Sequence, residues 1–552
     1  MNTILIGIIS PWAVTAAFLI SVGIILFQTP VLFRFIKKNL LLILLLLAIT
    51  FIGGYIRFQW TPNQHRIYFD EDRYLAYAVT FARFGQELNI NAASLQKVID
   101  GPPDTVARVT VPTVNAWILK LFGYNELYLI LGAKIFATFQ ILLLFAATYL
   151  LFKNIRTAVI ASSIFSLLPV PVFWAPSIAL DSYFVFFGLL AFCATIWYAK
   201  SPKFITALFL VLATLLLLFV RFEAFLFLLV QMSTIWAIRQ SDGEKLFSKK
   251  DLAVVFLFTL LIIFRILISV SVFGQTWCCG EATPLEAFEV GNIFKNTLPN
   301  VVDLFGKLEF PFMITVLSLY TVFSYKSKKI VPLILWILFY FFIYSFYFAG
   351  KFFTFEFSGS NGRYFLMVIP PMVMLAAIAL DNGIKKIREE KIKRKLIYVV
   401  LGVFLLLTLI PTALNYRKLV YLSPYDAVVD QAPRLIHEFT EFAFFPSVPK
   451  NALIIHSLTG LALMNNHPTI YYGSFLYDKR DISFLRSELK KGTPVYMLQS
   501  FTCDTTPDKC SLINPYFKII NVEMPTSHNA GRFVIAKLEL KSASESAREL
   551  NP

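Results

Sequence analysis

The segment 67-IYFDEDRYLAYAVTFARFGQ-86 places three carboxylates and a guanidinium directly after a long apolar run. These charged residues are Asp70, Glu71, Asp72 and Arg73. Asp70 can be interpreted in two ways. It can be the N-cap of an amphipathic helix on the membrane surface, because aromatic and small residues recur after it at helical spacing. Alternatively, the helix runs through Asp70, which then lies one turn before Tyr74 on the apolar face.

The second interpretation gives Asp70 a chemical role. A carboxylate held against an apolar face is partly desolvated, and desolvation raises its pKa and its basicity. A side chain of this kind suits a general base that takes a proton from a hydroxyl group beside a lipid.

Other charged residues are predicted at the same depth in the membrane. Asp181 opens an apolar run in 176-PSIALDSYFVFF-187, and Arg221 and Glu223 interrupt another in 219-FVRFEAF-225. Further cations near the outer ends of apolar runs are Lys134, Arg265 and Arg363. Each acid alone could be a helix cap, and each cation alone could extend to the lipid head groups.

Several cations at one depth indicate a bound anion. Arg suits phosphate because its planar fork makes two parallel charge-assisted hydrogen bonds. A phosphate at the depth of the outer leaflet belongs to a lipid. A base beside a lipid phosphate predicts the transfer of a group from that phosphate to a hydroxyl.

The chain that carries these residues is too apolar to be a soluble globule. Of its 552 residues, 57% are hydrophobic, and the mean hydropathy is +0.67. This composition predicts an α-helical polytopic membrane protein in contact with membrane lipids. The net charge of +16 therefore indicates cytoplasmic Lys and Arg, and not a nucleic-acid partner.

About twelve transmembrane helices are predicted, since a span needs ~20 apolar residues. The apolar runs lie near 4–28, 39–58, 126–152, 156–175, 180–198, 204–220, 222–238, 252–274, 308–324, 330–349, 364–383 and 396–414. Alternate loops are basic, most densely 385-KKIREEKIKRK-395, and the positive-inside rule places them in the cytoplasm. The first loop, 59–125, and the region after 414 then face outward.

The C-terminal region is patterned differently from the rest of the chain. Its pattern predicts a small extracytoplasmic α/β domain. Strand and helix patterns alternate within it, at 451–463, 479–492, 494–500, 516–524 and 532–540. Cys503 and Cys510 are plausible disulfide partners in an oxidising compartment. The tail 541–552 is predicted to be disordered.

Four short motifs resemble those of the GT-C integral-membrane glycosyltransferases, which include the protein O-mannosyltransferases and the lipid A aminoarabinose transferase. They are 70-DEDRYLAYA-78, 106-VARVTVPTVNAWILKLFGYNE-126, 179-ALDSYFVFF-187 and 362-GRYFLMVIPP-371. The resemblance covers roughly residues 40–385. It implies a catalytic transmembrane domain over 39–414. The extra N-terminal helix and cytoplasmic loop over 1–38 and the α/β domain over 415–540 depart from the simplest pattern of the family.

The resemblance implies an inverting enzyme. Its donor would be a sugar on polyprenyl or dolichyl phosphate, and its acceptor a hydroxyl on a protein, lipid or glycan. Asp70 matches the catalytic base, with Glu71 in support, and Asp181 matches a second acid. Arg363 matches a donor-phosphate contact. The other cations predicted at this depth, Arg221, Arg265 and Lys134, are expected to bind the phosphate with it. The other expected site residues are Tyr74, Arg73, Arg108, Tyr364 and Glu223.

Asp70 and Asp72 also form a D-x-D pair, which could bind a divalent cation. On a helix, however, residues two apart diverge, and Arg73 adds a positive charge. A divalent metal is therefore possible but not favoured, and no other cofactor is expected. The five histidines show no metal-ligand spacing and are assigned surface or core roles.

Two other functions are open. A transporter or flippase of a lipid-linked anion could use the same cations, although it would favour charges at mid-membrane and internal repeats. A surface sensor could use the C-terminal domain as its ligand module.

Overall fold

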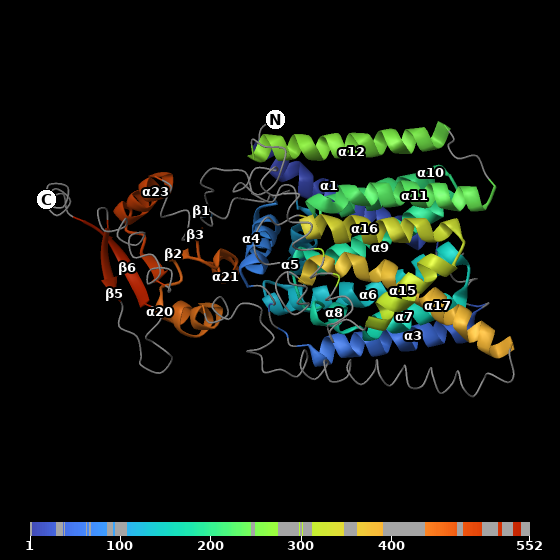
Figure 1. Ribbon diagram of the computed structural model, residues 1–552. Helices are drawn as coiled ribbons and strands as arrows, with labels where there is room; N and C mark the ends of the chain where they lie inside the picture. Colours follow the sequence, from blue (N-terminus) through green and yellow to red (C-terminus); the bar gives the residue numbers. More distant parts are fainter. Residues whose placement is uncertain are drawn as a thin grey trace.

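The structure is a computed structural model, and Figure 1 shows a long helical bundle with a smaller part that contains a β-sheet at one end. The residues that it describes are 3–28, 37, 39–61, 63, 65, 68–85, 92–93, 108–243, 249–273, 297, 301, 312–346, 362–389, 436–471, 479–499, 517–521 and 534–541.

Apolar helices of spanning length are present in the bundle. Among the described residues, five are long and apolar enough to cross a membrane: Ile9–Phe27, Leu40–Trp60, Glu126–Phe152, Leu180–Lys200 and Phe365–Lys385. Shorter apolar helices lie beside them, so the chain is an integral membrane protein by length and composition. The count of about twelve spans stays a prediction, and the run at 396–414 lies outside the described residues.

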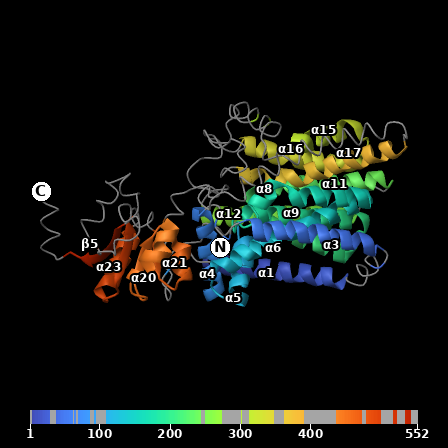
Figure 2. The ribbon, with the colours of Figure 1, turned by 90° about the horizontal axis from the view of Figure 1, so that it is seen from below.

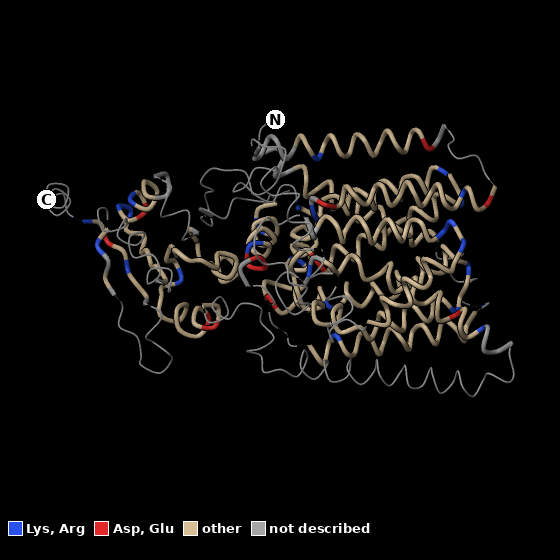
Figure 3. Tube along the Cα trace, in the orientation of Figure 1, with Lys and Arg blue, Asp and Glu red and all other residues tan. Residues whose placement is uncertain are grey.

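The bundle is built around α9 (Leu180–Lys200), which packs against α6 (Glu126–Phe152), α10 (Phe204–Leu218) and α11 (Leu226–Ser241). The remaining bundle helices are α1 (Thr3–Phe27), α3 (Leu40–Tyr55) continued by the π-helix η1 (Ile56–Trp60), α5 (Thr110–Phe122), α7 (Ile155–Leu167), α8 (Pro169–Phe173), α12 (Lys249–Phe273), α15 (Phe312–Ser324), α16 (Val331–Phe346) and α17 (Ile369–Glu389). Charged residues gather toward the ends of the helices, and their middles are nearly free of charge (Figure 3).

The predicted span at 156–175 is not one continuous helix. The helix α7 ends at Leu167, and the short helix α8 begins at Pro169. Leu168 between them is extended, with φ −64° and ψ 129°. A residue that precedes a proline is driven away from the helical conformation, so Pro169 accounts for the break.

The smaller part contains a six-stranded mixed sheet with strand order β1-β3-β2-β4-β6-β5. The strands are β1 (Ala92–Ala93), β2 (Leu453–His456), β3 (Thr469–Tyr471), β4 (Val495–Gln499), β5 (Phe517–Asn521) and β6 (Val534–Leu540). Strand β2 is parallel to β3 and β4, and the other pairs are antiparallel. The helices α20 (Phe445–Ser447), α21 (Thr459–Met464) and α23 (Lys479–Lys490) accompany it.

Most of these elements lie where the hydropathy pattern predicts them, but the short strands β1 and β3 are not predicted. Strand β1 comes from the first loop and pairs with β3 at the edge of the sheet. Cys503, Cys510 and residues 542–552 lie outside the described residues, so the predicted disulfide and disordered tail remain predictions.

The helix α4 (Tyr68–Phe84) lies between the bundle and the sheet, against α5 on one side and α21 on the other (Figures 1 and 2). Both of these neighbours cover the helix. Residues 74–82 are all buried, because α21 covers the face that a surface helix would leave in water.

Candidate functional site

Asp70 lies in the first turn of α4, which begins at Tyr68, so the helix runs through it. The capping interpretation of Asp70 is therefore wrong. Its side chain is 47% exposed, and Arg363 Nη2 donates a hydrogen bond of 2.6 Å to its Oδ2. Residues that lie 293 positions apart in the sequence thus meet at the end of the bundle that faces the sheet.

The backbone around Arg363 explains its place. It belongs to the 3-10 helix η4 (Gly362–Val368), which leads directly into α17. Pro370 and Pro371 occupy the first turn of α17, where a missing backbone N–H leaves no hydrogen bond unmade. Arg363 is therefore fixed at the entrance of a helix that continues into the bundle.

Asp181 is the centre of a chain of ion pairs. It is buried in the first turn of α9, where the helix dipole favours a carboxylate. Arg363 Nε lies 3.7 Å from its Oδ2, and Arg221 pairs with its Oδ1. Arg221 Nε also lies 3.5 Å from Glu223 Oε2. The acids and cations thus alternate in the order Asp70, Arg363, Asp181, Arg221, Glu223.

The structure corrects the expected direction of the Asp70 pKa shift. Burial would raise its pKa, but the nearby guanidinium groups outweigh burial, and the pKa lies below its usual value. Arg363 contributes most, followed by Arg108 and Arg73. Asp70 is therefore an ionised partner of Arg363, and a weaker base than its apolar surroundings alone would make it.

Tyr74 and Arg108 complete the surroundings of Asp70. Arg108 Nη1 donates a hydrogen bond of 3.0 Å to the Tyr74 hydroxyl. Burial raises the pKa of Tyr74 above its usual value, although Arg108 partly offsets this, so the phenol stays neutral at physiological pH. Arg73 is exposed.

Glu71 faces a different direction from Asp70. It is fully buried, and its carboxylate accepts hydrogen bonds from the Ser177 hydroxyl and, at 2.6 Å, from His65 Nδ1. It therefore anchors α4 to the segment before α9. Asp72 also diverges, because its carboxylate accepts the backbone N–H groups of Gly460 and Leu461 at 3.0 and 2.8 Å.

The contacts that the structure describes for the other two predicted phosphate ligands are not with the acids of this chain of ion pairs. Lys134 is fully buried, and its Nζ donates to Thr61 O at 2.9 Å and to Asn63 Oδ1 at 2.6 Å. Its ammonium group therefore supplies hydrogen bonds to oxygen atoms of the residues that follow η1. Arg265 on α12 lies over the Phe219 ring, with 5.3 Å from Cζ to the ring centroid. Tyr364 belongs to η4, but its side chain lies outside the described residues.

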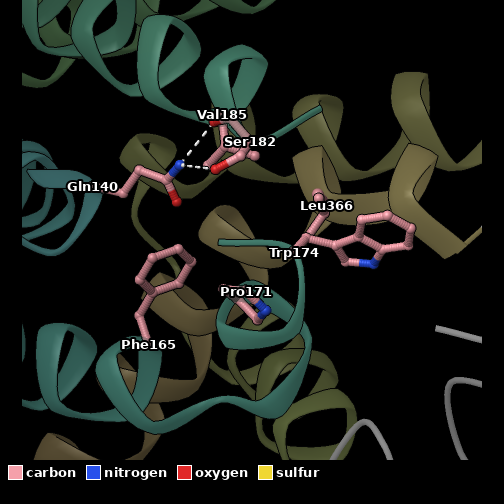
Figure 4. Close-up of a pocket in the computed structure, with 7 residues that line it drawn as sticks. All are labelled: Gln140, Phe165, Pro171, Trp174, Ser182, Val185 and Leu366. Atoms are coloured by element: carbon pink, nitrogen blue, oxygen red, sulfur yellow. Dashed lines mark hydrogen bonds between the residues drawn. The ribbon is translucent and has the colours of Figure 1, made fainter. Parts of the chain in front are cut away.

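A small internal cavity lies beside the first turn of α9 (Figure 4). Its lining residues are Gln140, Phe165, Pro171, Trp174, Ser182, Val185 and Leu366. Gln140 Nε2 donates to Ser182 O at 2.7 Å and to Ser182 Oγ at 3.1 Å, as the dashed lines show. With a volume of about 10 Å³ it is no larger than one water, so it cannot hold a sugar.

No family model and no curated protein matches the chain. Several solved structures resemble it over most of its length. The crystal structure of ArnT from Cupriavidus metallidurans bound to undecaprenyl phosphate has a TM-score of 0.52 at 14% identity, and the match covers 91% of this chain and 98% of ArnT. The archaeal oligosaccharyltransferase AglB from Archaeoglobus fulgidus, in complex with an inhibitory peptide and a dolichol-phosphate, has a TM-score of 0.50 at 12% identity, covering 91% and 76%. Both are GT-C glycosyltransferases, so the predicted resemblance is confirmed for the fold.

Proposed function

We propose that this protein is an inverting glycosyltransferase that works on the outer face of the membrane. It moves a hexose or pentose from a polyprenyl- or dolichyl-phosphate donor to a hydroxyl of a protein, lipid or glycan. The observation that carries the proposal is the contact between Asp70 and Arg363, a half-exposed carboxylate and a guanidinium at the end of the bundle. The GT-C fold supports it, since solved structures of that fold contain undecaprenyl phosphate or a dolichol-phosphate.

The donor phosphate binds to Arg363 and competes with Asp70 for its guanidinium. A phosphate offers several charged oxygens, and Arg binds such groups through paired hydrogen bonds. When Arg363 turns to the phosphate, Asp70 loses its principal cation, and its pKa rises. Donor binding thereby converts Asp70 from an ion-pair partner into a base.

The transfer is a single displacement. Asp70 removes the proton from the acceptor hydroxyl, whose oxygen forms a bond to the anomeric carbon. The bond between that carbon and the phosphate oxygen breaks on the opposite side, and the lipid phosphate leaves with the electron pair. Arg363 stabilises the charge on the leaving phosphate. No general acid is needed, because the phosphate leaves as an anion.

Asp181 acts through the arginines and does not contact the acceptor. Its carboxylate is buried and pairs with both Arg363 and Arg221. It therefore holds two guanidinium groups in place for the phosphate. The transfer step itself takes no divalent metal in this proposal, since Asp70 and Asp72 point to different partners.

The proposal is tested by supplying purified protein with a set of polyprenyl-phosphate sugars and hydroxyl acceptors. We expect free polyprenyl phosphate and a glycoside whose anomeric configuration is inverted, both measured by mass spectrometry and NMR. Movement of the intact lipid across a vesicle membrane, with no cleavage of the sugar–phosphate bond, would instead support a flippase.

A further inference from the structure

Three ligand-type side chains from distant parts of the chain converge beside α4. His65 precedes α4, Glu126 opens α6, and His437 lies in the helical turn at 436–439 that precedes η5 (Thr440–Phe444). One potential ligand atom from each lies within 4.8 Å of the other two. The histidines share no metal-ligand spacing in the sequence, but the fold brings His65 and His437 together, with their rings 5.5 Å apart.

The separations of these atoms have the size of a metal coordination sphere. His65 Nε2 lies 3.3 Å from Glu126 Oε2, and His437 Nε2 lies 3.0 Å from the same oxygen. Zinc binds imidazole nitrogen and carboxylate oxygen at about 2.0–2.2 Å, so neighbouring ligands in a tetrahedron lie ~3.3–3.5 Å apart. A small outward movement of each ligand would admit the ion.

The outer nitrogens of both imidazoles have carboxylate neighbours. Glu71 accepts a hydrogen bond of 2.6 Å from His65 Nδ1, and Ser177 in turn donates to Glu71. Glu441 Oε2 lies 3.8 Å from His437 Nδ1. Carboxylates behind metal-binding histidines fix the ring orientation and strengthen the nitrogen that faces the ion. Here the hydrogen bond to Glu71 directs His65 Nε2 toward Glu126, and Glu441 lies behind His437 at a longer distance.

The surroundings favour a cation and leave room for a fourth ligand. The three residues border a cavity of about 560 Å³, which also contacts Glu438 and Glu441. Among the described residues that line it there is no Lys or Arg. Two imidazoles and one carboxylate suit zinc better than magnesium, which prefers oxygen ligands alone.

We propose that His65, Glu126 and His437 bind a zinc ion, with water from the cavity as the fourth ligand. The ion joins the first outer loop, the start of α6 and the chain that leads to the sheet. Its role is structural, because Asp70 and Arg363 are not among its ligands. It fixes the C-terminal part against the bundle, and through Glu71 it also fixes α4.

The test measures metal content and needs no sugar donor, so it is independent of the proposed transferase activity. Purify the full chain with an affinity tag that contains no histidine, reload it with zinc, remove the excess and measure zinc by mass spectrometry. We expect about one zinc per folded chain. Glu126→Gln and His437→Gln should lose it. His437→Cys should keep it, because a thiolate replaces the imidazole as a zinc ligand.

His467→Gln is the matched control, since His467 is another buried histidine of the C-terminal part and stacks on Phe445 outside the cluster. It should retain zinc. Zinc should also raise the thermal midpoint of the wild type by about 2–5 °C over the protein treated with EDTA, and leave that of His437→Gln unchanged. A wild type that binds no zinc, or a His437→Gln variant that retains it, would overturn the proposal.

Discussion

Asp70 and Glu71 are neighbours in the sequence, but their side chains differ in exposure and in hydrogen-bond partners. Asp70 faces Arg363 and is nearly half exposed, whereas Glu71 is fully buried against His65 and Ser177. A helix turns by about 100° per residue, so adjacent carboxylates point to different surroundings. Only Asp70 has the exposure that a base needs to reach a substrate.

Replacing Asp70 by Asn should lower the transfer rate by about 10²- to 10⁴-fold without unfolding the protein. The two side chains have nearly the same shape, but an amide cannot take the proton. The measurement is turnover with the lipid-linked sugar, alongside the thermal midpoint. Asp242→Asn, at the exposed end of α11, serves as the control. Near-normal turnover by Asp70→Asn would mean that Asp70 has no catalytic role.

Replacing Arg363 by Met should weaken donor binding and change the pH profile. Loss of charge-assisted hydrogen bonds to the phosphate costs about 1.5–3 kcal/mol, or roughly 10- to 150-fold in donor affinity. Arg363 also holds the pKa of Asp70 below its usual value. Without Arg363 that pKa rises, so the acid limb of kcat/KM moves to higher pH.

The matched control for this variant is Arg156→Met, which removes a largely exposed arginine from the start of α7. Acceptor affinity, measured separately, should change less than donor affinity in Arg363→Met. An unchanged donor affinity together with an unmoved acid limb would remove Arg363 from the site.

At the scale of elements, α4 depends on close packing with α21. A Cβ atom added at Gly460 would lie 2.3 Å from Asp72 O and 2.9 Å from Ala76 N, both backbone atoms. Asp72 holds the same junction, because it accepts the backbone N–H groups of Gly460 and Leu461. The junction therefore combines a steric requirement for glycine with a buried carboxylate.

Gly460→Ala should destabilise this junction by about 1–3 kcal/mol, because backbone atoms must move to admit the methyl group. The thermal midpoint should fall, and proteases should cut the C-terminal part more readily. Gly383→Ala, in α17, is the control, since a Cβ there meets no heavy atom within 4 Å. Equal stability of the two variants would show that α4 and α21 do not pack this closely.

The sequence predicts these elements better than it predicts their contacts. Asp70, Asp181 and Arg363 are each adjacent to an apolar run. The predicted membrane orientation of these runs and their length therefore suffice to place the three residues at one depth in the membrane. Lys134 lies in an apolar helix as predicted, but its side chain points to the carbonyl and amide oxygens after η1, a direction that depends on how α6 packs. His65 and His437 share no local pattern, since only the folded chain brings them together.

At the scale of the whole molecule, the candidate site lies at the end of the bundle that carries the sheet (Figure 1). The basic loops after α6 and α9 lie at the opposite helix ends, where Lys153 and Lys200 are found. By the positive-inside rule the sheet and Asp70 face outward. This orientation is a prediction from charge and is open to a direct test.

The orientation is tested by labelling single cysteines in a background whose own five cysteines are replaced by Ser. Ser447→Cys lies on an exposed position near the sheet, and Asp242→Cys lies at the far end of the bundle. A maleimide that cannot cross membranes should label position 447 in intact cells and position 242 only after permeabilisation. The reverse pattern would place the candidate site in the cytoplasm.

The contact between Asp72 and the backbone of Gly460 also has a consequence for biosynthesis. The two residues are 388 positions apart, and a ribosome that adds about 5–20 residues per second needs roughly 20–80 s to make the chain between them. Throughout that interval α4 has left the ribosome without the helix that covers it. A nascent chain therefore contains α4 and Asp70 well before α21 can cover that helix, and the candidate site becomes rigid only after the C-terminal part has been made.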